Sequence, residues 1–173
     1  MSDTLITVIA IGLAAVLMFV FPLMTMSDRT DDVSQLAVET ATTDFVDEVR
    51  TTGKITPDKY SKFIESIGST GNTYNVEMQI QVLDENPGKK TTQTTKDKIG
   101  ENVYYSVYTT QIQDVLNSNN TYKLKEGDIF SVNVKNTNQT LAQQLKNFFY
   151  TVVGNDTYTI AASHGGMVTA TGK

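Results

Sequence analysis

The most prominent pattern in the chain is an uninterrupted apolar run near its N-terminus, from Thr4 to Met26. The run contains no charged residue, and more than 18 consecutive, predominantly apolar residues are typical of a membrane-spanning helix. As a helix it spans about 30 Å or more, enough to cross the hydrocarbon core of a bilayer. A buried helix of a soluble protein rarely runs this long without a strongly polar side chain. We therefore expect residues 1–26 to form a membrane-spanning segment.

A cleavable signal peptide is the alternative interpretation of this segment. Such a peptide needs a basic N-terminal region and small residues at the cleavage site. Residues 1–3 hold neither Lys nor Arg, and Met24, Thr25 and Met26 do not match an A-x-A site. The pattern favours a helix that stays attached to the rest of the chain.

The helical pattern continues past the apolar run as an amphipathic one. No Gly or Pro occurs between Leu23 and Thr52, and Gly53 then supplies a stop signal. Apolar residues recur on one side and acidic residues on the other, which indicates a helix that covers a folded domain. We predict one helix from about Asp3 to about Thr52. Its head-packing face is expected to be Val33, Ala37, Ala41, Phe45 and Val49.

Pro22 lies inside this predicted helix. Proline removes one backbone hydrogen bond and crowds the preceding turn. We expect the helix to be kinked or locally loosened around Met18–Pro22.

The remainder of the chain predicts a small α+β head, residues 27–173, in which residues 27–52 continue the long helix. Thr56 before Pro57 begins a second helix, and the strict alternation from Tyr74 to Val82 predicts a half-buried strand in a mainly antiparallel sheet. A further helix is predicted from about Tyr104 to Asn117, although its Tyr- and Thr-rich start could instead be extended. A second strand is predicted at Ile129–Val134, and a helix after Thr140 should bury Leu141, Leu145, Phe148, Phe149 and Val152. The chain is expected to end in a hairpin whose strands, Tyr158–Ile160 and Met167–Ala170, are joined by a turn at Gly165 and Gly166.

Residues suited to catalysis or metal binding are sparse. His164 is the only histidine and adjoins Ser163, but neighbouring side chains on an extended chain diverge, so the pair does not form a nucleophile and base. The absence of cysteine excludes disulfides, thiolate zinc sites and cysteine nucleophiles. No phosphate-binding loop, EF-hand or histidine–carboxylate metal pattern occurs. We expect a protein that is not an enzyme and uses no cofactor or metal.

Charge and small residues narrow the choice of partners. The net charge of −5 argues against nucleic acid as a partner, because phosphate binding needs a basic surface.

The first half of the apolar helix contains closely spaced small residues, namely Ala10, Gly12, Ala14 and Ala15. Such residues would let helices approach closely in an apolar environment. Plain membrane anchors also use Gly and Ala, so the apolar helix leaves self-association and simple anchoring equally open.

The apolar segment resembles the N-terminal helix of type IV pilins and of their tight-adherence relatives. The likeness rests on residues 8–15, VIAIGLAA, followed by apolar residues up to Pro22. Those pilins also place a kinking proline late in the hydrophobic helix and continue into an amphipathic half that packs on a small α+β head. The region from Phe45 to Tyr60 looks like small pilin-like proteins of Gram-positive bacteria. The chain differs from the pilins at Leu5, where they carry a glutamate.

The resemblance implies a structural subunit that waits in the membrane and then packs its helix into the core of a filament on the cell surface. Its partners would be identical copies, the membrane before assembly, and proteins of an assembly machinery, and its large domain would be extracellular. The implied assembly residues are Val8, Ala10, Ile11, Gly12, Ala14, Ala15, Phe19 and Pro22. The alternative is a single-pass membrane protein with an extracellular ligand-binding or scaffolding domain that does not polymerise.

Overall fold

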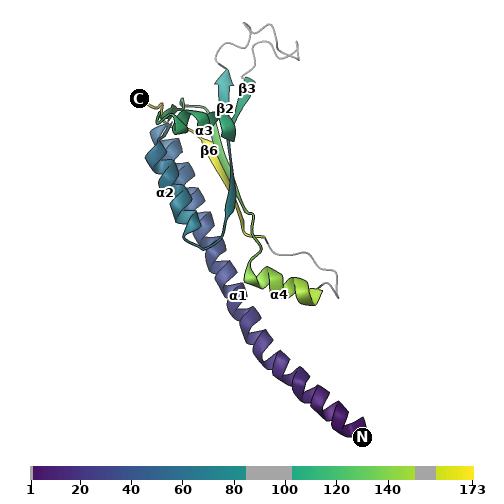
Figure 1. Cartoon of the computed structure of the whole chain (residues 1–173). Coiled ribbons are helices and arrows are strands. Elements are labelled where there is room, and N and C mark those ends of the chain that lie inside the picture. Colours follow the sequence, from purple (N-terminus) through teal and green to yellow (C-terminus); the bar gives the residue numbers. More distant parts are fainter. Residues whose placement is uncertain (1, 85–102, 151–158) are drawn as a thin grey trace.

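The computed structural model describes residues 2–84, 103–150 and 159–173. One helix, α1 (Ser2–Thr52), is 51 residues long and forms the axis of the molecule. Its N-terminal half projects alone from a small head that contains the other described elements (Figure 1). The expected α+β layout, a long apolar helix followed by a small antiparallel sheet with extra helices, is confirmed.

The head is built on a four-stranded antiparallel sheet with the strand order β3-β2-β5-β6, beside a small pair of strands, β1 and β4. Val132 lies at its centre, paired with Met78 on one side and with His164 on the other. The elements after α1 are β1 (Lys54–Ile55), α2 (Pro57–Gly68), β2 (Tyr74–Asp84), β3 (Val103–Tyr108), α3 (Thr109–Asn117), β4 (Tyr122–Lys123), β5 (Ile129–Asn136), α4 (Leu141–Tyr150) and β6 (Ala161–Met167).

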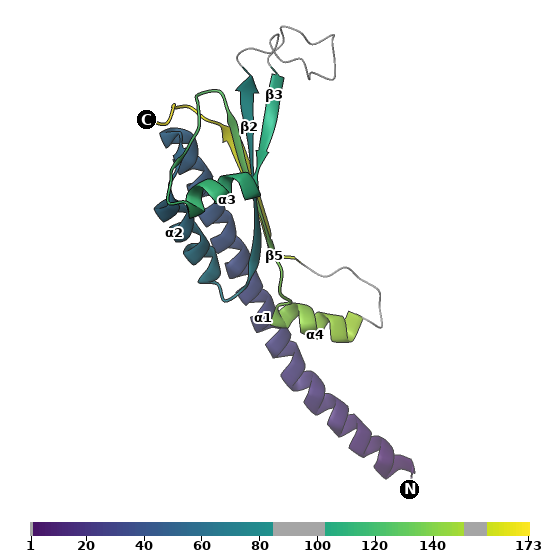
Figure 2. The same cartoon turned by 45° about the horizontal axis from the view of Figure 1, so that its top comes forward.

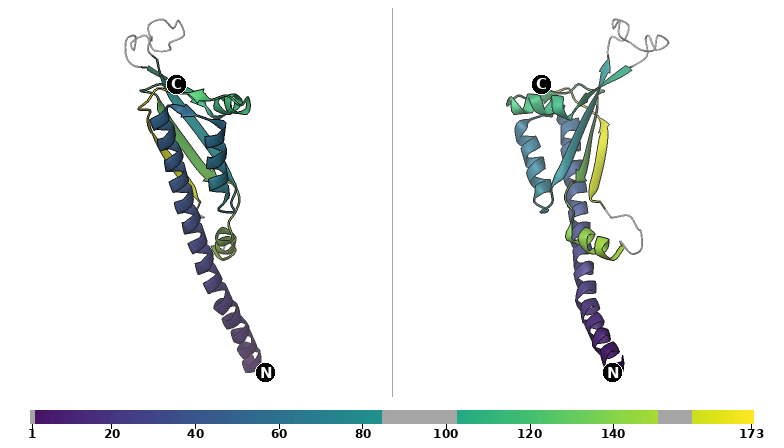
Figure 3. Two further views of the ribbon diagram at one scale, coloured as in Figure 1. Left: turned by 90° about the vertical axis from the view of Figure 1, so that its left-hand side faces the viewer. Right: turned by 45° about the vertical axis from the view of Figure 1, so that its right-hand side comes forward.

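One face of the sheet is covered by α1 and α2, which run side by side (Figure 3). The predicted alternation in β2 is confirmed: Met78 and Ile80 are buried toward the helices, while Glu77 is exposed on the other face. The predicted start of α2 is also confirmed, because the Thr56 hydroxyl accepts a hydrogen bond from the Lys59 backbone N–H at 3.3 Å. Alternation thus separates an apolar inner face from a polar outer one.

Phe45 of α1 is the centre of the core. Its ring stacks on Phe63 of α2 with centroids 4.5 Å apart, and it meets Phe130 of β5 edge-on at 5.9 Å. Tyr60 lies tilted at 6.4 Å. One side chain therefore joins the long helix, the second helix and the sheet through offset and edge contacts, which aromatic rings favour.

The predicted head-packing face of α1 is only half right. Phe45 and Val49 are buried and Ala41 is partly buried, but Val33 is 68% exposed and Ala37 is also exposed. The reason is geometric: a spacing of four residues advances about 40° per step around a helix with 3.6 residues per turn, so the stripe winds off the contact face. The observed contact face follows the true helical repeat and includes Asp31, Ser34, Val38, Thr42, Phe45, Val46 and Val49.

Pro22 does not break α1, which is helical on both sides of it. The helix curves gradually along its projecting half instead of showing a sharp kink (Figure 1). The helix is thus continuous through Pro22, and the expected kink or loosening around Met18–Pro22 stays a prediction.

The segment predicted as a helix from about Tyr104 is extended at its start. Residues 103–108 form β3, which pairs with β2, and α3 begins only at Thr109. The aromatic and β-branched residues of this stretch suit a pleated surface, and pairing with β2 decides in favour of the strand. At the junction, Thr109 Oγ1 accepts from the Met78 N–H at 2.7 Å and donates to the Met78 carbonyl at 3.1 Å, so its side chain continues the pairing.

The predicted C-terminal hairpin is also wrong, since β6 is one strand that includes both glycines. A Cβ atom on Gly165 would lie 2.8 Å from the Cβ of Ser131, and one on Gly166 would lie 2.6 Å from the Cζ of Arg50. These glycines thus mark close approach to a neighbouring strand and to α1, not a turn. Of the strand expected before the turn, Ile160 is buried directly before β6 and Tyr158 lies outside the described residues.

The predicted buried face of the last helix differs as well. Leu141 is 54% exposed, and α4 instead buries Ala142 and Gln143. Leu145 is partly buried, while Val152 and the side chains of Phe148 and Phe149 lie outside the described residues.

The packing predicts that the head folds without the projecting half of α1. Residues 3–26 are almost entirely exposed, so they contribute little to the core. A fragment that begins at Ser27 is expected to be soluble and monomeric and to unfold in one cooperative transition, followed by circular dichroism during urea titration. An insoluble or unfolded fragment would place the boundary of the head elsewhere.

The corrected contact face of α1 gives a paired prediction. In the full chain, held in detergent, Phe45→Ala should lower the free energy of unfolding by about 3–5 kcal/mol, because it empties the aromatic cluster. The control Val33→Ala removes an exposed side chain and should change it by no more than about 0.5 kcal/mol. Equal losses in the two variants would contradict the observed orientation of α1.

Candidate functional site

The projecting half of α1 is the first candidate functional region. It is long and apolar enough to cross a membrane, and none of its most apolar stretch is buried against the head. Large side chains such as Met18 and Phe19 are 76% and 77% exposed. Water does not solvate such a surface favourably, so this half of the helix needs lipid or other protein around it. The structure contains one candidate membrane-spanning helix among its described residues.

The assembly residues implied by the pilin resemblance all lie on this half and are all exposed. Among these residues, Val8, Ile11 and Phe19 are the large apolar side chains, and each is more than half exposed. Gly12 has open space around its Cα, with no described heavy atom within 4 Å of the position that a Cβ would take. The remaining exposed members are Ala10, Ala14, Ala15 and Pro22. The structure brings these residues together only as successive turns of one helix.

The projecting half joins the head through a polar seam. Ser27, Asp31 and Ser34 are at most 7% exposed, and they face the base of the head instead of an apolar core. The Asp31 carboxylate accepts a hydrogen bond from the Thr140 hydroxyl at 2.6 Å. A cleft of about 280 Å³ lies at this seam, between α1, the turn after α2 and the start of α4.

Thr140 also begins α4. Its hydroxyl accepts from the Gln143 N–H at 3.2 Å, while its own N–H donates to the Gln143 side-chain oxygen at 3.1 Å, so the two residues form a reciprocal capping box. Asn138, just before it, accepts from the Thr73 N–H and donates to the Asn72 side chain, both at 2.9 Å. These bonds hold α4 beside α1 at the level where the helix leaves the head (Figure 2).

A second polar group fixes the upper part of α1 to the edge strand β6. Asp47 bonds Arg50 at 2.8 Å and lies 3.4 Å from Nε2 of His164, while Nε of Arg50 donates to the Met167 carbonyl at 3.0 Å. Lower down, the Gln35 amide accepts from the Ala161 N–H and donates to the Ala161 carbonyl. His164 therefore contributes to the clamp between helix and strand, and its place in a strand corrects the expected hairpin turn.

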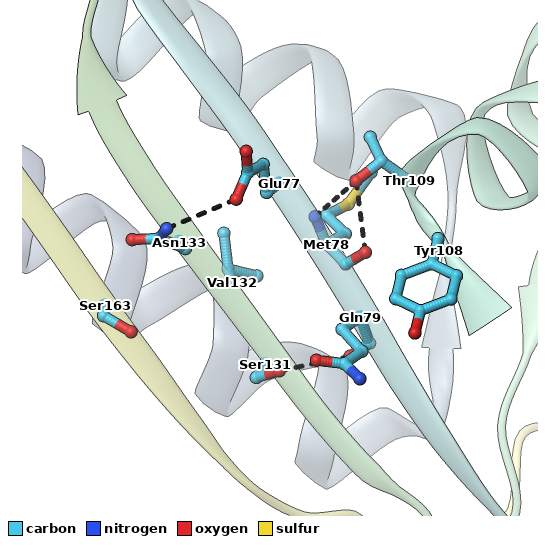
Figure 4. Close-up of a pocket in the computed structure, with 9 residues that line it drawn as sticks. All are labelled: Glu77, Met78, Gln79, Tyr108, Thr109, Ser131, Val132, Asn133 and Ser163. Atoms are coloured by element: carbon cyan, nitrogen blue, oxygen red, sulfur yellow. Dashed lines mark hydrogen bonds between the residues drawn. The ribbon is translucent and has the colours of Figure 1, made fainter. Parts of the chain in front are cut away.

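The open face of the sheet is the second candidate region. A depression of about 450 Å³ lies over β2 and β5, beside the start of α3 (Figure 4). Glu77 is the one carboxylate among its lining residues, which are otherwise amide, hydroxyl, apolar and aromatic. Asn133 donates to Glu77 at 3.4 Å, and Ser131 donates to the Gln79 carbonyl at 3.4 Å. Ser163 also lines it, on the opposite side of β6 from His164.

The chemistry of these two regions differs. A single carboxylate without a positioned second acid or base is a poor arrangement for general acid–base catalysis. Within the described ranges, no three His, Asp or Glu side chains are grouped so that they could hold a metal ion. Burial raises the pKa of Tyr122, and Tyr105 and Asp128 raise it further, but Tyr122 belongs to β4 and lines neither region. The apolar helix therefore remains the stronger candidate.

Sequence reasoning missed the residues of the polar seam. The acidic residues of the amphipathic half are expected on its solvated side, but Asp31 is buried, and the helical repeat from Val49 and Val38 leads back to residues 34 and 31. The spacing of Thr140 and Gln143 in the sequence is enough to predict the capping box. The hydrogen bond between Thr140 and Asp31 could not be predicted in this way, because the two residues are far apart in the chain.

Comparison with known proteins does not assign the chain to a family, since no family model, curated protein or solved structure matches it.

Proposed function

We propose that this chain is a non-enzymatic structural subunit of a cell-surface filament of the type IV pilus kind, which assembles through its N-terminal helix. The observation that carries the proposal is the division of α1. One side of residues 31–49 packs on the head, whereas residues 3–26 are predominantly apolar, uncharged after Asp3 and almost entirely exposed. A rigid continuous helix with one free apolar half is suited to packing against copies of itself.

The mechanism moves the free half from lipid into a bundle of identical helices. Both surroundings are apolar, so the exchange carries little hydration cost, and close packing of small residues supplies the attraction. Before assembly the chain is a single-pass membrane protein with its head outside the cell. Its partners are further copies and the proteins that extract it from the membrane, and nucleic acid is not among them.

The second candidate is a membrane-anchored extracellular domain that binds a ligand or acts as a scaffold without polymerising. The depression on the open face of the sheet favours it, because its amide and hydroxyl groups could hydrogen-bond a polar ligand. In that case the helix would be only an anchor, and any apolar span of equal length could replace it.

Membrane residence gives the first functional prediction. Val16 lies in the middle of the projecting half and is 52% exposed. Val16→Arg should cost about 2.5–3.5 kcal/mol of insertion free energy and shift the chain into the extractable fraction when membranes are washed with carbonate. Val16→Leu is the control and should remain in the membrane pellet. Wild-type chain found entirely in the soluble fraction, outside any filament, would refute the membrane assignment.

Assembly gives the second functional prediction. Replacing residues 4–26 by an unrelated apolar span of the same length should preserve membrane anchoring but abolish filaments, because the helix surfaces that pack together are lost. Negative-stain microscopy of material sheared from cells, together with carbonate extraction, separates the two properties. Filaments that persist with the foreign span would contradict assembly through the packing surface of this helix, whereas wild-type cells without filaments would support the anchored-domain alternative.

A further inference from the structure

The outward side of α1 within the head carries a short exposed apolar stretch, a little over one turn long, between Arg29 and Thr40. Val33 and Leu36 are 68% and 65% exposed, and Ala37 is exposed beside them. A groove of about 460 Å³ separates part of this side from the end of α2. We call the side formed by the following residues the outer strip: Arg29, Val33, Leu36, Ala37 and Thr40.

A positive charge stands at the lower end of the outer strip. Arg29 is exposed, and the ion pairs among the described residues do not include it. Of the acids nearby, Asp31 is turned inward to Thr140, Asp28 is partly buried and Asp32 is exposed. Arg29 is thus the positively charged side chain at the lower end of the outer strip that could pair with an acid of another molecule.

The projecting half of α1 carries a matching face on its first turns. Asp3, Thr7, Ala10 and Ala14 follow one another at steps of four, three and four residues, and such positions share one side of a helix. The outer strip repeats the same steps in Arg29, Val33, Leu36 and Thr40, each 26 positions further along. If the two sets lay side by side in this register, an acid would face the arginine, and small side chains would face Val33 and Leu36. The Thr7 hydroxyl donates to the Asp3 carbonyl at 2.8 Å, so its hydrogen-bonding capacity is largely met within the helix.

We propose that, in the assembly described above, a second copy of this chain lays this small face of its α1 on the outer strip, with Asp3 against Arg29, Thr7 against Val33 and Ala10 against Leu36. The inference rests on the proposed filament, because assembly brings the copies side by side. The two helices run parallel and are offset by 26 residues, about 39 Å along the axis. An unpaired carboxylate among apolar helices is costly, so registers that leave Asp3 without a cation are disfavoured. The charge pair fixes the register, and the steric match of small against large side chains holds it.

Charge exchange tests the pair in the full chain. Asp3→Lys and Arg29→Glu, made singly, should each reduce the yield of sheared filaments by at least about tenfold, because like charges would meet. The double variant should restore the yield to within about twofold of wild type, since the pair is re-formed with its signs reversed. The controls Asp58→Lys and Lys62→Glu make the same charge changes on the exposed surface of α2 and should leave the yield unchanged. Carbonate extraction of every variant checks that membrane insertion is intact.

Cysteine cross-linking tests the register directly, because the chain contains no cysteine of its own. In filaments oxidised with copper phenanthroline, the pair Thr7→Cys and Val33→Cys should give a ladder of disulfide-linked chains. Each single variant, and the off-register pair Thr7→Cys with Thr40→Cys, should stay monomeric on a non-reducing gel.

The outcomes separate this inference from the proposed function. Wild-type filaments with no ladder from the first pair, an equal ladder from the off-register pair, or a double charge variant no better than the single ones would overturn the register while leaving the filament in place. Wild-type cells without filaments would overturn both.

Discussion

The contact between residues 31–49 of α1 and the four-stranded sheet is the constraint on which the rest of the molecule depends. Phe45 lies at its centre, stacked on Phe63 and edge-on to Phe130, so a single side chain joins the long helix, α2 and β5. Because α1 is unbroken, fixing this half on the sheet also fixes the direction in which the apolar half leaves the head. Burial of aromatic area thus does more than stabilise the head, since it aims the projecting helix.

The polar seam below this contact separates two parts of one helix that need different surroundings. Above the seam, α1 covers an apolar core, whereas below it the helix is apolar on every side. Asp31 and Thr140 satisfy each other, and no buried side-chain nitrogen or oxygen in the described ranges lacks a partner. Burying a polar group that keeps its hydrogen bonds carries only a small free-energy penalty. Polar residues can therefore form the lower boundary of the apolar core without destabilising the head. It also places α4 beside the point where the helix emerges.

The outward side of α1 and the open face of the sheet are the two surfaces that this arrangement leaves available. The sheet face is polar, shallow and internally hydrogen-bonded, as expected of an antiparallel sheet with one side in water. The outer strip is apolar at its centre and lies on the same helix as the projecting apolar half, with Arg29 between the two. A filament built on that helix would use both of its halves, one as the inserted element and the other as the surface that receives a neighbour.

The sequence by itself determined the features that depend on local pattern: the long helix, its uncharged first half, the start of α2 at Thr56, and the alternation of β2. Tertiary structure decided the features that depend on distant partners. Pairing with β2 made residues 103–108 a strand, and close approach to Ser131 and Arg50 placed Gly165 and Gly166 inside β6. The apolar stripe also did not determine which side of α1 faces the head. An acid such as Asp31 can be buried there because the fold supplies Thr140 as its hydrogen-bond partner. Periodicity is a property of the chain, whereas burial of a polar group depends on what the fold brings against it.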